Sequence, residues 1–291
     1  MKTDNRIVIK GLAPIHRKPD ATSELTDETA HGMIVEVTGP KENGFFPVRT
    51  HYRYEGYMPE CCLSCEDDGA AAALWAKENK WTSWSPYLDV HTKPAVQSHT
   101  ILSIPRSALL RIVPEDEKPV LSEEENKEGW TCVGLSDGRL GYVRSVCIKN
   151  EIKYRGDNAD YRQAEDEIRR ELVRTAMLYM GTQYRWGGKT PLGIDCSGLT
   201  AVSYLLNGFT IYRDADILPG FDMREIPIGE MKEGDLIFFE GHVAMYTGNG
   251  EFVHSTAYHK SEGVVVNSLW PDSPVYREDL KKIIIKIGSI F

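Results

Sequence analysis

The chain has 291 residues, of which 41% are hydrophobic and 26% charged, so it can form two or three domains with cores of their own. Its formal net charge of −9 argues against nucleic acid or an anionic membrane as the main partner. The sequence contains no apolar run long enough for a transmembrane helix, and "MKTDNRIVIK" lacks the apolar core of a secretory signal. We therefore expect a cytoplasmic protein, or a periplasmic one if a signal peptide has been removed.

The N-terminal half is predicted to contain two copies of a small all-β unit. The segments "LAPIHRKPD" (12–20) and "YLDVHTKPA" (87–95) share a His-x-Lys-Pro core, and a Gly-Tyr step recurs later at Gly56 and Gly141. Short strands broken by Gly, Pro and Asn in units of this size are typical of small barrels. The expected boundaries are residues 1–66 for the first unit, 67–80 for a linker with helical propensity and 81–150 for the second unit.

The C-terminal part, residues 151–291, has the pattern of an α+β domain. Residues 160–181 are predicted to form an amphipathic helix that ends near Gly181. Its apolar residues recur at helical spacing: Ile168, Leu172, Ala176, Tyr179 and Met180. Three strands are expected farther along, at "GDLIFFE" (234–240), "HVAMYTG" (242–248) and "EFVHST" (251–256).

A cysteine stands where another helix is expected to begin. Asp195 can cap this helix, and Cys196 occupies its first turn, followed by an apolar stripe that ends before Gly208. The N-terminal dipole of a helix favours an anion, so we expect a lowered thiol pKa and a nucleophilic thiolate. The alternative is a buried structural cysteine, which is the usual state of a lone cysteine.

Two histidines on adjacent strands could supply the base that such a nucleophile needs. If the turn consists of residues 248–250, His242 and His254 become diagonal neighbours on one face of a hairpin, roughly 7–8 Å apart at Cβ. A two-residue turn would place them on opposite faces. The interpretation of a base oriented by a second imidazole therefore depends on the odd-length turn.

The segments "YRWGGKTPLGIDCSGL" and "GDLIFFEGHVAMYTGNGEFVHST" resemble the NlpC family of papain-like cysteine peptidases, which cleave bacterial cell-wall peptides, over about residues 165–290. The resemblance implies that Cys196 is the nucleophile, His242 the general base and acid, and His254 the residue that orients His242. Tyr184 would hold the oxyanion together with the Cys196 backbone N–H. The expected fold is two small all-β SH3-like barrels followed by an α+β papain-like cysteine peptidase domain.

This arrangement is similar to that of γ-D-glutamyl-L-diamino acid endopeptidases of murein peptide recycling. The resemblance implies hydrolysis of the γ-D-Glu–L-diamino acid bond in murein tri- or tetrapeptides with a free N-terminal L-Ala, releasing L-Ala-γ-D-Glu through an acyl-enzyme. Asp214, in "YRDADIL", matches the acidic group that binds the substrate ammonium. Glu24 and Tyr54 of the first barrel match further substrate contacts, and Ser197 and Asp195 are expected to line the D-Glu subsite.

Other functions remain open at this stage. A murein-peptide binding protein without turnover, or an amidase or acyltransferase, could use the same scaffold. The cluster of Cys61, Cys62 and Cys65 lacks an obvious fourth ligand for zinc, and the chain is too large to need disulfides, so we expect no metal and no cofactor. We expect a monomer whose partner is the murein peptide.

Overall fold

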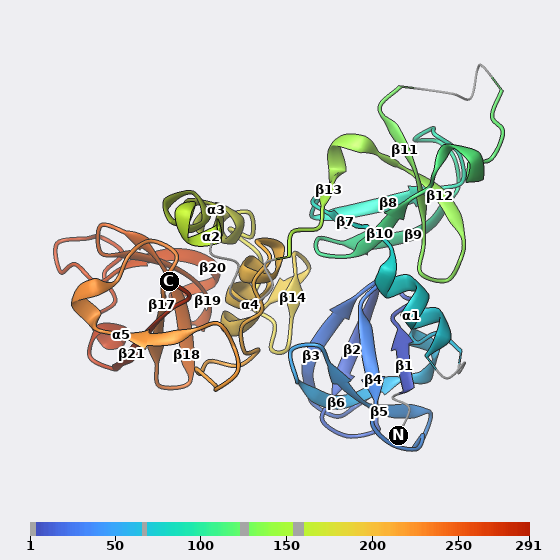
Figure 1. The fold of residues 1–291 in the computed structure, drawn as a ribbon. Coiled ribbons are helices and arrows are strands. Elements are labelled where there is room, and N and C mark those ends of the chain that lie inside the picture. Colours follow the sequence, from blue (N-terminus) through green and yellow to red (C-terminus); the bar gives the residue numbers. More distant parts are fainter. Residues whose placement is uncertain (1–3, 66–68, 123–127, 154–159) are drawn as a thin grey trace. The chain divides into compact units, whose positions relative to one another are not determined.

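The computed structural model describes residues 4–65, 69–122, 128–153 and 160–291, and it divides into two compact units, Met1–Glu151 and Ile152–Phe291. Two β-sheets make up most of the first unit, and the second combines a larger sheet with helices (Figure 1). The predicted fold class, small β units followed by an α+β domain, is confirmed. None of the helices in the described ranges is long and apolar enough to cross a membrane.

The first sheet has six antiparallel strands in the order β1-β4-β5-β6-β2-β3. Its strands are β1 (Asp4–Ile7), β2 (Leu12–His16), β3 (Leu25–Ala30), β4 (Ile34–Val37), β5 (Phe45–Thr50) and β6 (Glu55–Pro59). Alternate residues of these strands point inward, so Ala13, Ile15, Val48 and Met58 belong to one buried apolar cluster. The sheet thus closes around its own core.

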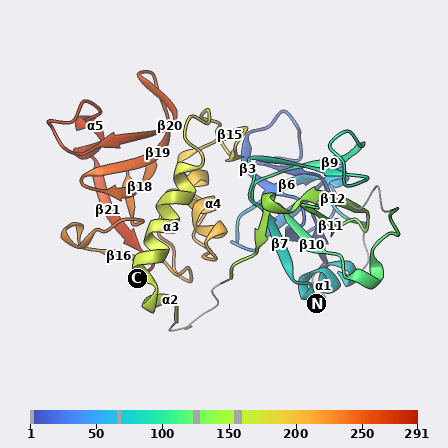
Figure 2. The ribbon, with the colours of Figure 1, turned by 90° about the horizontal axis from the view of Figure 1, so that it is seen from above.

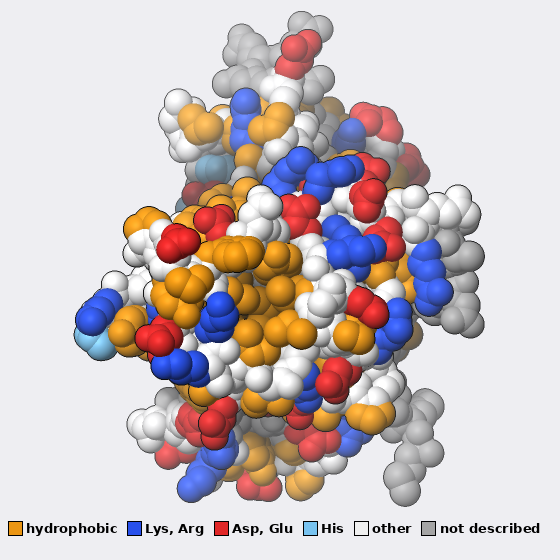
Figure 3. All heavy atoms as spheres, turned by 90° about the vertical axis from the view of Figure 1, so that its left-hand side faces the viewer, with side chains coloured by type: hydrophobic (Ala, Val, Ile, Leu, Met, Phe, Trp, Pro, Cys, Tyr) orange, Lys and Arg blue, Asp and Glu red, His pale blue; other side chains and the backbone are white. Residues whose placement is uncertain are grey.

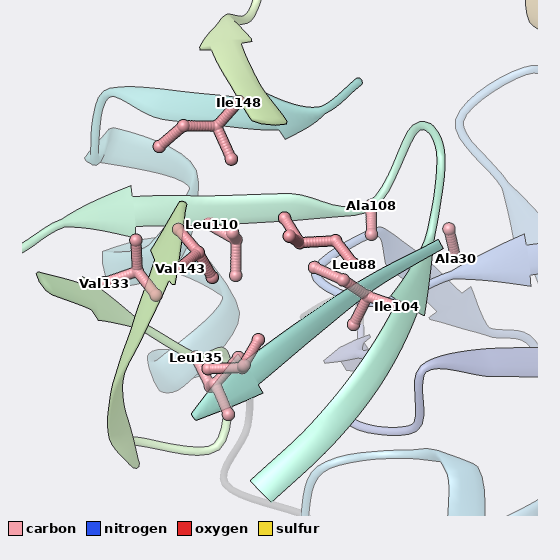
Figure 4. Close-up of a cluster of buried hydrophobic side chains, with 10 residues drawn as sticks. Ala30, Leu88, Ile104, Ala108, Leu110, Val133, Leu135, Val143 and Ile148 are labelled. Carbon is pink, nitrogen blue, oxygen red and sulfur yellow. The ribbon is translucent and has the colours of Figure 1, made fainter. Parts of the chain in front are cut away.

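The second sheet repeats this topology in the order β13-β7-β10-β11-β12-β8-β9. Its strands are β7 (Lys80–Ser83), β8 (Tyr87–His91), β9 (Thr100–Pro105), β10 (Leu109–Ile112), β11 (Trp130–Gly134), β12 (Leu140–Arg144) and β13 (Ile148–Asn150). Six strands follow the order of the first sheet, and β13 adds a seventh at the edge. The core includes Leu88, Leu110 and Val143, and Ala30 of β3 also packs against it (Figure 4).

The duplication extends to single hydrogen bonds. His16 and His91 occupy equivalent positions, each at a register shift near the end of its strand. The Nδ1 atom of each ring lies 3.2 Å from a backbone carbonyl, that of Ser23 in the first barrel and that of Ser98 in the second. The recurring His-x-Lys-Pro segment is therefore the turn between equivalent strands.

The repeated Gly-Tyr step has a steric cause. A Cβ atom on Gly56 would lie 2.4 Å from the Ile15 Cγ2 atom, and one on Gly141 would lie 2.5 Å from the Val90 Cγ1 atom. Only glycine allows the neighbouring strand to approach this closely. Each barrel needs a glycine at this place in its core.

Two side chains connect the barrels of the first unit. Helix α1 (Ala70–Lys77), in the predicted linker, carries Trp75, whose Nε1–H donates to the carbonyl of Gly32 at 2.7 Å. His31 is fully buried; its Nδ1–H donates to the carbonyl of Ile9, and its Nε2 accepts from the backbone N–H of Ser136 in the second barrel at 3.1 Å. This arrangement requires a neutral imidazole.

We expect the first unit to lose stability in acid because of His31. Burial lowers the pKa of His31 from 6.5 to about 4. The folded state therefore resists a proton that the unfolded chain accepts, so the stabilisation is complete above pH 6.5 and is lost as the pH falls toward 4. A shift of this size corresponds to roughly 3 kcal/mol. Urea unfolding of His31→Gln and wild type should show their difference in unfolding free energy shrinking by about that amount over this window.

The matched control is His99→Gln, because His99 is an exposed histidine of the same unit. Its unfolding free energy should follow that of the wild type at every pH. A difference between His31→Gln and wild type that stays constant from pH 7 to pH 4 would contradict the role of His31.

The second unit is built on a six-stranded antiparallel sheet in the order β16-β21-β17-β18-β19-β20. Its strands are β16 (Arg224–Ile226), β17 (Leu236–Phe239), β18 (His242–Gly248), β19 (Glu251–Tyr258), β20 (Ser261–Ser268) and β21 (Ile284–Ser289), and a separate ribbon pairs β14 (Lys189–Thr190) with β15 (Gly193–Ile194). The helices are α2 (Asp160–Gln163), α3 (Glu165–Met177), α4 (Cys196–Leu206) and α5 (Glu278–Lys281). Helices α3 and α4 pack on one side of the sheet (Figure 2).

An apolar cluster in this sheet lies next to the strands of the two candidate histidines. It consists of Ile237, Phe239, Ala244, Phe252, Ile287 and, from α5, Leu280. Ile226, Met231 and Tyr246 are partly buried and pack against it. A side view of this unit shows hydrophobic side chains gathered near the centre of the face, with charged ones around them (Figure 3). The cluster gives the sheet a second apolar layer besides the helices.

The prediction of one helix over residues 160–181 is wrong about where the helix ends. The chain forms α2 and α3, and α3 ends at Met177. From Leu178 to Met180, each backbone N–H bonds to the carbonyl three residues earlier, so the chain tightens into turns before Gly181. Met180 consequently lies outside the buried stripe and is 44% exposed, whereas Tyr179 is fully buried.

Candidate active site

Cys196 is the first residue of α4, as predicted. The side chain of Asp195 caps the helix by accepting from the backbone N–H of Gly198 at 2.6 Å. Gly198 has no room for a side chain, since a Cβ atom would lie 2.2 Å from the carbonyl oxygen of Gly188. The Asp-Cys-Ser-Gly sequence therefore encodes the cap, the thiol and the close approach of the preceding loop.

A buried ion pair fixes the carboxylate of Asp195. Arg213, only 1% exposed, donates from Nη1 to Oδ1 at 3.0 Å and from Nη2 to Oδ2 at 2.9 Å. Oδ2 also accepts from the backbone N–H of Gly187 at 2.8 Å, and Arg213 Nη1 lies 2.8 Å from the Ser197 Oγ atom. The polar atoms of Asp195 and Ser197 are thus used within the protein, and their contact with a D-Glu residue stays a prediction.

The expected lowering of the Cys196 pKa is wrong. Burial raises the pKa of the thiol to about 11, and the nearby Asp195 carboxylate acts in the same direction. Backbone N–H groups of Val243 and Ser197 donate to the sulfur and act in the opposite direction, but desolvation dominates. Cys196 does lie at the helix N-terminus, but its side chain is so deeply buried that desolvation, and not the helix dipole, determines the protonation state of the thiol. At neutral pH the thiol keeps its proton.

The two histidines lie on one face of a hairpin, as predicted. In β18 and β19, Met245 pairs with Val253, and this register brings the His242 Nε2 atom within 2.7 Å of the His254 Nδ1 atom. His242 is also the residue before Val243, whose N–H bonds to the Cys196 sulfur. The thiol and the first imidazole are therefore neighbours across the α4–β18 contact.

The turn of this hairpin differs from the prediction. Gly248 pairs with Glu251, so the loop contains only two residues, Asn249 and Gly250. Both have positive φ angles, 51° and 73°, as a tight hairpin turn requires. A β-bulge at Thr247 supplies the odd residue that keeps both histidines on one face.

A third polar side chain, absent from the prediction, continues this row. His254 is fully buried, and its Nε2 atom lies 2.8 Å from the Oδ1 atom of Asn267 in β20. The Nδ2 atom of Asn267 donates to the carbonyl of Val275 at 3.3 Å. Little in the sequence points to this role of Asn267, because the pattern predicts no strand at β20 and Asn is a common turn residue.

Burial makes both histidines poor bases at rest. It lowers the pKa of His242 to about 3, aided by His254 and Arg277, and that of His254 to about 4. The apolar surroundings include Phe239, with a ring centroid 5.8 Å from that of His242, and Phe252, 5.1 Å from that of His254. The resting site holds a neutral thiol beside neutral imidazoles.

Tyr184 lies close enough to the thiol for the two side chains to interact electrostatically. It forms an isolated bridge with Ile194, the residue before the helix cap. Burial raises its pKa, and the negative charge of Asp195, together with that of the Cys196 thiolate whenever it forms, acts in the same direction. The phenol therefore keeps its proton and can donate a hydrogen bond beside the sulfur.

Asp214 follows the buried Arg213 and points outward. Its carboxylate is exposed, and the Tyr212 hydroxyl donates to it at 3.4 Å. Asp214 lines a hollow shared with Thr200 of α4 and with Phe221. Because Arg213 bonds to the cap of α4, the chain holds Asp214 close to the helix that carries the candidate nucleophile.

Comparison with known proteins shows which family the chain belongs to. The sequence pattern of the NlpC/P60 family matches residues 181–277. A relative from Lysinibacillus sphaericus named dipeptidyl-peptidase 6 is 40% identical over 287 residues, 99% of this chain and 100% of the relative. The chain belongs to the NlpC/P60 family.

Two further NlpC/P60 comparisons bear on activity and fold. A gamma-D-glutamyl-L-lysine dipeptidyl-peptidase of Bacillus subtilis (strain 168) is 32% identical over 179 residues, 58% of each chain. The crystal structure of an NlpC/P60 family protein from Bacillus cereus ATCC 10987 has a TM-score of 0.74 and covers 97% of this chain and 98% of its own, at 19% identity. The likeness to that structure is one of fold.

The remaining predicted site residues belong to the first unit of this NlpC/P60 protein. Glu24 is exposed and forms an ion pair with Arg17, with the Nε and Oε2 atoms 2.6 Å apart. Tyr54 is half-buried, and its backbone N–H donates to the Thr50 Oγ1 atom. Their contact with substrate stays a prediction.

Proposed function

We propose that this protein is a cysteine peptidase that hydrolyses the γ-D-Glu–L-diamino acid bond of murein tri- and tetrapeptides and releases L-Ala-γ-D-Glu. The observation that carries the proposal is the Cys196 thiol at the start of α4 beside the His242–His254 pair. It occurs in a chain similar along its whole length to a dipeptidyl-peptidase 6. A second relative is named for the γ-D-glutamyl-L-lysine bond, which supports the substrate class.

The neutral resting site indicates how the reaction proceeds. The Cys196 sulfur attacks the γ-carbonyl carbon of D-Glu as its proton passes to His242, and the oxyanion is held by the Cys196 backbone N–H and the Tyr184 hydroxyl. Collapse breaks the C–N bond, and His242 returns the proton to the leaving amine. Water then hydrolyses the thioester, with His242 accepting a proton from water and giving it back to the sulfur.

The free N-terminal ammonium of the substrate is assigned to Asp214. An ammonium that leaves water needs an anionic, hydrogen-bonded partner. Asp214 is an exposed carboxylate positioned by the buried Arg213 near α4. Glu24 and Tyr54 are proposed as further substrate contacts. Peptides with a blocked amine would lose the charge-assisted contact with Asp214, so the enzyme would select free murein peptides.

This proposal predicts a defined response to substrate acetylation. The wild type should release L-Ala-γ-D-Glu from a free murein tripeptide, detected by mass. N-acetylation of the tripeptide should lower kcat/KM at least tenfold, because a charge-assisted pair contributes about 1.5–3 kcal/mol. Asp214→Asn should lower kcat/KM by a similar factor with the free peptide and by a much smaller factor with the acetylated one. The reason is that acetylation and the substitution remove the same interaction.

Asp272→Asn is the matched control. Asp272 is an exposed acid of the same unit that is not among the residues lining the hollow beside Asp214, so its replacement should leave kcat/KM near the wild-type value. Equal cleavage of free and acetylated peptides, or strictly additive losses in the cycle, would disprove the ammonium assignment. Absence of any cleavage of the γ-D-Glu bond would disprove the proposed function itself.

A further inference from the structure

Asn267 ends a row of buried polar side chains that starts at the nucleophile. It lies in β20, opposite β19, and is 5% exposed. Its Oδ1 atom faces the His254 Nε2 atom at 2.8 Å, while its Nδ2 atom faces the Val275 carbonyl at 3.3 Å. A carbonyl oxygen can only accept, so the Val275 contact fixes which end of the amide faces the histidine.

We propose that Asn267 is a positioning residue that sets the tautomers of both histidines and thereby aims an unprotonated His242 Nδ1 atom at the Cys196 thiol. This inference rests on the proposed peptidase function, but it concerns a residue outside the Cys–His–His set. In this arrangement His242 donates a hydrogen bond to His254, and His254 donates one to Asn267.

The direction follows from donor and acceptor counting. Oδ1 of Asn267 is an acceptor, so the proton of neutral His254 is on Nε2, and its Nδ1 atom carries a lone pair. That lone pair lies 2.7 Å from the His242 Nε2 atom, which must therefore be the N–H donor. In a neutral imidazole the other nitrogen is then unprotonated. Nδ1 of His242 is left as the base.

The opposite tautomer would disable the site. With the proton of His254 on Nδ1, that atom would donate to the His242 Nε2 atom, and the proton of His242 would be on Nδ1. Nδ1 could then not accept the proton when the S–H bond of Cys196 breaks. Asn267 disfavours this state because a lone pair on the His254 Nε2 atom would face the Oδ1 lone pairs without a proton between them.

Burial, aided by the positive charge of Arg277, keeps the row neutral. The His242 ring faces His254 and the positive charge of Arg277, and the His254 ring faces Arg277 and Asp279. Arg277 is itself paired with Asp279, with the Nη2 and Oδ2 atoms 2.7 Å apart. From α4, the nearest titratable group is the Cys196 thiol, which is protonated at rest. The tautomers therefore matter, because neither ring is an imidazolium before the reaction.

Asn267→Leu removes the acceptor and keeps a similar shape, and Asn267→Asp keeps an acceptor and adds charge. The matched control is Asn207→Leu, because Asn207 is 7% exposed and its Nδ2 atom bonds to the Thr175 Oγ1 atom and the Ser203 carbonyl, away from the histidines. Histidine tautomers are measured by ¹⁵N NMR of selectively labelled protein. Kinetics are measured on the free murein tripeptide from pH 3 to pH 9, a range that includes the lowered pKa values of both histidines.

In the wild type we expect protonated Nε2 and unprotonated Nδ1 on both His242 and His254. Asn267→Leu should mix the tautomers and lower kcat about 10–100-fold with little change in KM, as loss of an orienting partner does elsewhere. Asn267→Asp should keep the tautomers, recover activity relative to Asn267→Leu and move the acid limb of kcat/KM to higher pH, because a carboxylate favours the imidazolium.

Wild-type tautomers in Asn267→Leu, with a kcat equal to that of Asn207→Leu, would overturn the proposal. If Asn267→Leu does not fold, the pH shift of Asn267→Asp decides, and an unmoved acid limb overturns it. If the wild type cleaves no murein peptide, the proposed function fails, but the NMR spectra of the wild type and Asn267→Leu still decide whether Asn267 sets the tautomers.

Discussion

Replacement of Cys196 with alanine is expected to abolish hydrolysis and to leave the fold intact. The thiol is the nucleophile that the described residues place beside the histidine pair, so its loss should lower kcat on the order of 10⁵–10⁶-fold. The structural cost is small, because alanine is a better helix former and the α4 cap is made by Asp195. Release of L-Ala-γ-D-Glu by mass and thermal unfolding by circular dichroism measure the two effects.

The control for this prediction is Cys132→Ala. Cys132 is another buried cysteine, 3% exposed, in the apolar core of the second barrel. Its replacement should lower the melting temperature and leave kcat near that of the wild type. Persistent hydrolysis by Cys196→Ala, at more than a thousandth of the wild-type rate, would mean that another group is the nucleophile.

Much of this site is local in the sequence, and that part could be predicted. The cap by Asp195, the thiol at the first turn and the closely packed Gly198 lie within four consecutive residues, so their geometry follows from helix-capping rules. The duplication in the first unit was also visible, because each barrel repeats the same His-x-Lys-Pro segment and a later Gly-Tyr step.

The features that were not predicted correctly depend on contacts between segments that lie far apart in the sequence. The Thr247 bulge has no marker in the sequence, and a two-residue turn alone would have separated the histidines onto opposite faces. The partner of His254 is Asn267 on β20, a strand that was not predicted. The register of two strands decides such a contact, and single-sequence patterns do not encode register well.

The prediction of a lowered Cys196 pKa was wrong for a different reason. The helix terminus was predicted correctly, but its effect competes with desolvation, and desolvation depends on everything packed around the sulfur. A sequence shows that a cysteine begins a helix but not how deeply the side chain is buried. The result changes the mechanism, because a neutral thiol must lose its proton during the attack.

Replacement of Arg213 with methionine is expected to cause the largest loss of stability. It removes a buried cation that donates to both carboxylate oxygens of Asp195 and to Ser197. The carboxylate stays behind, 9% exposed, with only part of its hydrogen bonds. Breaking a buried pair in this way costs about 3–5 kcal/mol, because the remaining charge is left uncompensated.

A double-mutant cycle separates this effect from simple loss of packing. Asp195→Asn together with Arg213→Met removes both charges, so the double variant should lose less unfolding free energy than the sum of the two single variants. Lys282→Met serves as the control, since its pair with Glu278 is exposed and should contribute less than about 1 kcal/mol. Urea unfolding of the four variants gives the free energies.

Arg213→Met should also lower kcat, because a displaced Asp195 no longer caps the helix that positions Cys196. A loss as small as that of Lys282→Met would show that the buried pair does not hold the start of α4.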